Sequence, residues 1–165
     1  MSQAWWTTKS RQFFRHLTAR VSAAERAELS GWLTPAQLAV FDAMHRADRR
    51  HGLDVARALR SAGHDQPDIL LAGLLHDCAK GARVGIWHRV GWSLGARYGR
   101  RVRAIAERLP GFRVAFADLD THAERSAALA LAAGCSPRTA ELIRHQADPA
   151  DNALGEALRL ADEAS

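Results

Sequence analysis

The chain has 165 residues and a mass of 18.1 kDa, the size of one ordinary domain that buries enough surface to fold without cross-links. Its residues are 47% hydrophobic and 25% charged, a balance that argues against an intrinsically disordered chain. No window approaches the ~20 consecutive apolar residues of a membrane-spanning helix, and the first residues lack the apolar stretch of a secretion signal. Two cysteines, Cys78 and Cys135, are too few for a disulfide framework, so we expect a cytoplasmic protein.

The net charge of +5 is concentrated in one segment of the chain. Residues 81 to 113 contain eight arginines and a single acid, Glu107. A segment of this kind attracts nucleic acid, an anionic membrane or a polyphosphate substrate. Arginine also supplies 21 of the 23 basic residues of the chain, so a solvated helix face explains the segment equally well.

The pattern of capping residues predicts an all-α protein with a single domain. Strand signals are almost absent, whereas proline and glycine lie where helices begin and end, as in Thr34-Pro35, Gly63 and Ser136-Pro137. The apolar run from Ile69 to Leu75 predicts a buried central helix. Helices are expected over residues 9–29, 36–44, 51–62, 67–75, 87–108, 120–133, 137–145 and 151–165.

Histidine and aspartate residues are the strongest functional signal. His76 and Asp77 directly follow the most apolar helix, where a carboxylate beside an imidazole needs a hydrogen-bond partner or a metal ion. If the pair is considered alone, ordinary hydrogen bonds at the end of a helix explain it without a metal ion. Four further residues of these types are flanked by apolar positions of their own helices, namely His51, His122, His145 and Asp162. Such ligands on facing helices suit Fe, Mn or Zn, and six of them suit two ions that share a carboxylate.

The order of these residues resembles the HD-domain superfamily of metal-dependent phosphohydrolases. The resemblance covers about residues 35 to 165 and depends on His51-Gly-Leu-Asp-Val-Ala, Leu74-Leu-His-Asp-Cys-Ala-Lys80, His122, His145 and Ala161-Asp162. It implies an HD-domain-like helical bundle over residues 34–165, with the basic segment as a helical insertion at about 81–113. Residues 1–33 then form an N-terminal amphipathic helix that packs on the bundle.

The resemblance also implies an activity and a set of ligands. The expected activity is hydrolysis of a phosphate ester or anhydride in a nucleotide or related metabolite, with two divalent transition-metal ions as cofactors. Fe or Mn is expected, and Zn, Ni, Co and Mg are alternatives. The implied ligands of the first ion are His51, His76, Asp77 and Asp162, and Asp77 bridges to a second ion held by His122 and His145. No GYP-type motif follows His145, which argues against hydrolysis of cyclic-di-GMP.

Lys80 is one of only two lysines in the chain, and it lies one helical turn after the His76-Asp77 pair. A compact ammonium group binds phosphate as a point charge, so we expect Lys80 to act in catalysis and, with Arg144, to bind the substrate phosphate. A cation at a helix end is the alternative for Lys80. The alternative for the whole chain is a non-catalytic HD-type module that senses a nucleotide or binds a partner. The basic segment then contacts an anionic membrane or nucleic acid.

Overall fold

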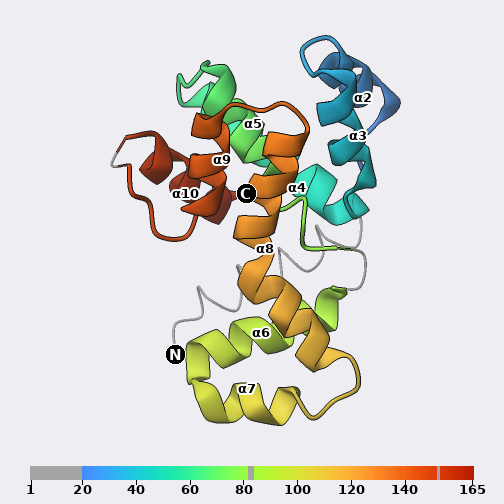
Figure 1. The fold of residues 1–165 in the computed structure, drawn as a ribbon, viewed down its shortest axis with the longest axis vertical. Coiled ribbons are helices and arrows are strands. Elements are labelled where there is room, and N and C mark those ends of the chain that lie inside the picture. The colour runs from blue at the N-terminus through green and yellow to red at the C-terminus, as the bar shows by residue number, and fades with distance from the viewer. Residues whose placement is uncertain (1–19, 82–83, 152) are drawn as a thin grey trace.

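The computed structural model describes residues 20–81, 84–151 and 153–165 (Figure 1). The described residues contain helices and turns but no strand, which confirms the all-α prediction. The helices are α2 (Ala23–Ser30), α3 (Pro35–Ala43), α4 (Arg46–Ser61), α5 (Pro67–Leu75), α6 (Ile86–Tyr98), α7 (Arg100–Ala106), α8 (Phe112–Ala132), α9 (Pro137–Arg144) and α10 (Leu154–Ala164). None of the described helices is long and apolar enough to cross a membrane.

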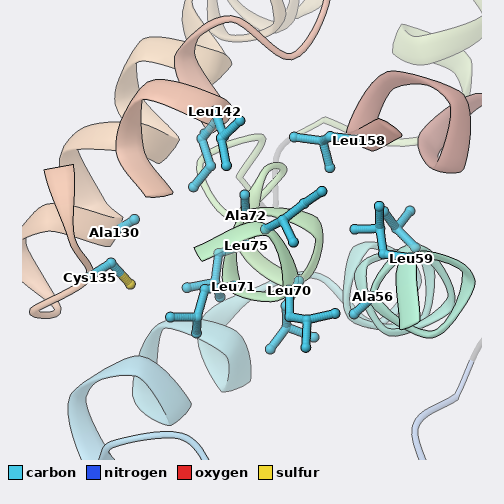
Figure 2. Close-up of a cluster of buried hydrophobic side chains, with 14 of the residues drawn as sticks. Ala56, Leu59, Leu70, Leu71, Ala72, Leu75, Ala130, Cys135, Leu142 and Leu158 are labelled. Atoms are coloured by element: carbon cyan, nitrogen blue, oxygen red, sulfur yellow. The ribbon is translucent and has the colours of Figure 1, made fainter. Parts of the chain in front are cut away.

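Helix α5 lies at the centre of the main core, as its apolar sequence predicts (Figure 2). Every residue from Ile69 to Leu75 is buried, because α4, α9 and α10 pack around the helix. Removing side chains such as Leu74 from water contributes about 1.5–3 kcal/mol each, so this helix anchors the bundle. The ends of α4, α5 and α10 therefore have fixed relative positions.

Helices α6 and α7 lie at one end of the molecule, beside the first half of α8 (Figure 1). They have a small core of their own, formed by Val84, Ala115, Phe116 and Leu119. The second half of α8 returns to the main core through Ala127 and Ala130. Helix α8 thus connects the basic segment to the bundle.

Several helix boundaries differ from the prediction, and glycine explains two of them. The helix expected over residues 87–108 is interrupted at Gly99, whose φ of 90° is a left-handed conformation that other residues rarely adopt. The helix expected from residue 120 begins at Phe112, directly after Gly111 with φ 82°. Apolar periodicity does not reveal where a backbone reverses, so these two boundaries were wrong.

Three further boundaries were also wrong. Helix α4 begins at Arg46, which places His51 inside the helix rather than at its start. Helix α10 begins at Leu154 rather than at residue 151. Ser22 is the N-cap of α2, so the helix expected over residues 9–29 does not continue through it, and residues 9–19 lie outside the described part of the chain.

Candidate metal centre

The close contact between α4 and α5 brings His51 and His76 together. Gly52 faces the backbone of α5, and a Cβ atom added to Gly52 would lie only 2.4 Å from the carbonyl oxygen of Leu74. The two helices can approach this closely only because Gly52 has no side chain. The ring centroids of His51 and His76 are consequently 5.2 Å apart, in an edge-to-face arrangement.

His76 and Asp77 begin the tight turn that follows α5, and both are buried. Two side chains from other segments fix this turn. The hydroxyl of Ser126 on α8 accepts a hydrogen bond from the backbone N–H of Ala79 at 3.0 Å. The amide of Gln146, just after α9, donates to the carbonyl oxygen of His76 at 3.3 Å. The two candidate ligands are therefore held in place from both sides.

Asp162 on α10 completes a group of four side chains. Its Oδ1 atom lies 2.7 Å from Nε2 of His51 and 3.3 Å from Nε2 of His76. Candidate ligand atoms of His51, His76 and Asp77 lie within 4.8 Å of one another, and this is the one group of that kind found among the described residues. Three separate segments thus converge on one point with two imidazoles and two carboxylates.

Two buried atoms of this group lack hydrogen-bond partners. Nδ1 of His76 lies 2.9 Å from the carbonyl oxygen of Gly73, an acceptor, so Nδ1 carries a proton. Nε2 of His76 lies 3.4 Å from Oδ2 of Asp77 and 3.3 Å from Asp162, but it is hydrogen-bonded to neither. Oδ1 of Asp77 is also buried without a partner. Buried polar atoms are almost always paired, so these two fit a site that holds a cation.

The electrostatics of the group favour positive charge at the same place. Burial alone would lower the pKa of His76, but the carboxylates of Asp77 and Asp162 outweigh it and raise that pKa to about 10. Burial would raise the pKa of Asp77, yet the neighbouring His76 and Lys80 hold it well below its ordinary value. The pKa of Asp162 is lowered in the same way, by His51 and His76 against the effect of burial. Both aspartates are therefore charged at neutral pH.

His122 approaches Asp77 from α8. Its Nδ1 atom lies 2.5 Å from the carbonyl oxygen of Leu119 and so carries a proton, which leaves Nε2 unprotonated. This Nε2 atom lies 3.5 Å from Oδ1 of Asp77, on the carboxylate oxygen that does not face His76. Burial lowers the pKa of His122, which keeps the ring neutral. Asp77 therefore lies between the ring of His76, whose raised pKa favours the charged form, and the neutral ring of His122, whose Nε2 atom presents a lone pair.

His145 is not brought to this group. It is the C-cap of α9, its side chain is exposed, and it lines a hollow of about 10 Å³ beside Arg138 and Asp151. The next residue, Gln146, is the one whose side chain points inward, to His76. The second ligand pair expected from the sequence is thus incomplete, because His145 follows the exposed Glu141 by four residues and so lies on the outward side of α9.

The two expected phosphate-binding residues also lie in different places. The ammonium group of Lys80 forms an ion pair with Oδ2 of Asp77, and its side chain is 20% exposed. The guanidinium group of Arg144 instead pairs with Glu124 at 2.7 Å on the exposed side of α8 and α9. Among the described contacts, none joins Arg144 to the four converging side chains. Lys80 is therefore at the candidate site, whereas Arg144 is not.

The buried Asp48 and the partly buried Arg89 form an ion pair beside the centre that the sequence did not predict. Asp48 lies one turn before His51 on α4 and accepts two hydrogen bonds from Arg89 of α6, at 2.7 and 2.8 Å. The pKa of Arg89 is raised because Asp48, with a contribution from Asp77, outweighs the effect of burial. In the sequence, Arg89 is one of the eight arginines of the basic segment, and nothing there distinguishes it from the others. A detectable signal was Asp48 itself, an acid on the buried face of α4 that needs a cation.

Comparisons with protein-family models, with curated proteins and with solved structures found no match to this chain. The coordinates establish an all-α protein with a histidine–aspartate cluster that could hold a metal ion. Any assignment of function must therefore come from the chemistry of this cluster.

Proposed function

We propose that the chain is a metal-dependent phosphohydrolase of the HD-domain type, acting on a phosphate ester or anhydride of a nucleotide or related metabolite. The observation that carries the proposal is the buried His76–Asp77 pair, whose unpaired Nε2 and Oδ1 atoms face the ligands of two other helices. The histidine, histidine–aspartate and aspartate residues also follow one another along the chain in the order of that superfamily. Geometry and sequence order thus support the same assignment.

One divalent ion is held by the four converging side chains, His51, His76, Asp77 and Asp162. Two imidazoles and two carboxylates suit Fe or Mn, and Zn, Ni, Co and Mg are compatible with some of the same ligands. When bound, the ion supplies Lewis-acid activation of a water molecule and neutralises charge on a phosphate group. The chain's own residues keep the ligands aligned, through Gly52 at α4 and Ser126 at the turn after α5.

A second ion, expected from the sequence, has fewer ligands in this arrangement. Without His145, the described residues place only His122 and the second oxygen of Asp77 where such an ion would lie. The ammonium group of Lys80 also lies against Asp77, and its positive charge disfavours binding of a second metal ion there. We therefore propose one firmly held ion and assign His122 a different role. Its neutral Nε2 atom, beside the carboxylate of Asp77, would accept the proton that the attacking water molecule loses.

Lys80 is the phosphate-binding residue of the proposed site. It is partly exposed, so its ammonium group is accessible from solvent while it contacts Asp77. With Asp77 committed as a metal ligand, the ammonium group of Lys80 would be free to bind a phosphate oxygen. The Arg89–Asp48 pair holds α6 against α4 next to this site, so it positions the wall beside His51.

The test is metal analysis of freshly purified protein, followed by chelation and anaerobic return of Mn²⁺ or Fe²⁺ with a panel of nucleotides and phosphate esters. About one equivalent of metal and metal-dependent release of phosphate are expected. Asp77→Asn should lose both, whereas Asp42→Asn, which removes a carboxylate from a surface ion pair with Arg26, should lose neither. Absence of metal and of activity would overturn the proposal, and tight nucleotide binding without turnover would identify a non-catalytic module instead.

A further inference from the structure

Five arginines of the basic segment form a group of exposed side chains. They are Arg97, Arg100, Arg101, Arg108 and Arg113, which we call the arginine group, and all five are exposed. None of them forms an ion pair with any residue that the structure describes. Two arginines of the same segment do form ion pairs, Arg89 with Asp48 and Arg103 with Glu107 and Asp120. The positive charge of the arginine group is therefore not neutralised within the described chain.

The outer side of α6 carries an apolar stripe next to this charge. Trp87, Val90, Leu94 and Tyr98 follow at intervals of three and four residues and so share one face of the helix. Trp87 is 68% exposed and Tyr98 is 49% exposed. The inner side of α6 is fixed by its glycines, because Gly91 lies against Phe112 and Gly95 against Arg103.

Helix α7 and the turn after it repeat this combination. Ile105 is 64% exposed and lies between Arg101 and Arg108 on one side of the helix, and Leu109 follows one turn later. Val114, in the first turn of α8, is also exposed, next to Arg113. Exposed aliphatic side chains and unpaired arginines thus occur together on α6, on α7 and at the start of α8, which lie at the end of the molecule beneath the bundle (Figure 1).

We propose that this end of the protein is a docking surface for an anionic lipid bilayer. Arginines bind lipid phosphates, while exposed tryptophan, tyrosine and aliphatic side chains enter the boundary between headgroups and acyl chains. Nucleic acid would also attract the arginines, because its phosphates are negatively charged. However, proteins bind nucleic acid through contacts to phosphates and stacked bases, which offer no apolar region in which isoleucine, leucine and valine could be buried. The aliphatic residues therefore decide between the two partners. This inference does not depend on the metal centre.

Vesicle co-sedimentation tests the surface directly. The full chain should bind vesicles of mixed phosphatidylcholine and phosphatidylglycerol and should not bind phosphatidylcholine alone, and added salt should weaken the binding. Each arginine near an anionic surface is worth about a five-fold change in binding, so the triple variant Arg97→Gln/Arg101→Gln/Arg108→Gln should bind roughly 100-fold more weakly. Ile105→Ser/Leu109→Ser should weaken binding while leaving the charge unchanged.

The matched control removes the same charge from the main bundle. Arg57→Gln/Arg60→Gln/Arg125→Gln replaces three arginines that are paired with acids, and it should bind vesicles like the wild type. Circular dichroism of each variant checks that the fold is retained. Equal loss in both triple variants would overturn the proposal, because the binding would then depend only on net charge. Binding of single-stranded RNA, lost in the first triple variant while vesicles are not bound, would also overturn it.

Discussion

His122 and His145 have the same expected role in the sequence but different surroundings in the structure. His122 presents Nε2 to Asp77, whereas His145 is exposed at the end of α9. We therefore expect His122→Ala to reduce phosphate release about 10- to 100-fold, as is typical when a group beside metal ligands is removed. His145→Ala should change neither activity nor metal content. Initial rates and metal analysis of the two variants measure this difference, and equal losses in both would contradict the separation.

Gly52 is a second position where a single side chain decides the geometry of the centre. A Cβ atom there meets the backbone of Leu74, which cannot move aside as a flexible side chain could. Gly52→Ala should therefore lower the free energy of unfolding by about 1–3 kcal/mol, the range for overpacked cores, and should lower metal affinity by separating His51 from His76. Urea unfolding and metal titration measure the two effects.

The control for this substitution is Gly85→Ala. Gly85 has a φ of −75°, and an added Cβ atom would lie 3.7 Å from Nδ1 of His88, an ordinary contact. Because Gly85 is the N-cap of α6, where alanine is less favourable than glycine, the variant should lose about 0.5–1 kcal/mol of stability, and its metal affinity should not change. If Gly52→Ala were equally mild, α4 and α5 would have room to separate without cost, and Gly52 would not explain the position of His51.

At the scale of helices, the Asp48–Arg89 pair attaches α6 to α4. Replacing one partner leaves a buried charge without compensation, which costs about 3–5 kcal/mol. Arg89→Met should therefore destabilise strongly, and the double variant Asp48→Leu/Arg89→Met should recover much of the loss. Urea unfolding of the single and double variants measures the coupling. Arg125→Met, which breaks an exposed pair with Asp118, should cost only about 0–1 kcal/mol, and a similar value for Arg89→Met would contradict a buried pair.

Glu25 attaches α2 to α4 in the same way, but on the surface. Its carboxylate contacts Arg50 and Arg57, and its pKa is held well below the ordinary value of 4.5 by hydrogen bonds from the Ser22 backbone and from Arg50, against the effect of burial. A carboxyl group with a lowered pKa stabilises the fold above its ordinary pKa and loses this effect as the pH falls below it. Glu25→Gln should thus lower stability by about 1 kcal/mol at neutral pH.

The same substitution should cost progressively less in acid. At about pH 3 the wild type has lost part of the contribution of Glu25, so the two proteins should differ less than at neutral pH. Urea unfolding at both pH values measures this change. Glutamine keeps the hydrogen bond to the Ser22 backbone, so the comparison isolates the charge. A difference that grows in acid would contradict the ion-pair explanation.

For the whole molecule, the sequence predicted the helices and residue groups that depend on local pattern, but it did not predict contacts between segments that are distant in the chain. Apolar runs and capping residues predicted α5 and the starts of α3 and α9, because these signals act within a few residues. Residue types and their order indicated His51, His76, Asp77 and Asp162 before their contact was known. The partner of Asp48 could not be predicted, since Arg89 reaches it from 41 residues away. His145 lies four residues after the exposed Glu141 and shares its outward side of α9, but the residue types alone did not show which side of that helix is buried.

Metal binding should stabilise the entire fold, because the four ligands come from α4, the turn after α5 and α10. An ion at about 100 times its dissociation constant adds about 2.7 kcal/mol to the free energy of unfolding. For a chain of this length, that amount corresponds to a rise of about 5–10 °C in Tm. Thermal unfolding of chelated protein with and without Mn²⁺ measures it. Asp77→Asn should show no rise and His145→Ala the full rise, since only Asp77 is among the converging ligands. A rise that persists in Asp77→Asn would mean that the ion stabilises the chain from another place.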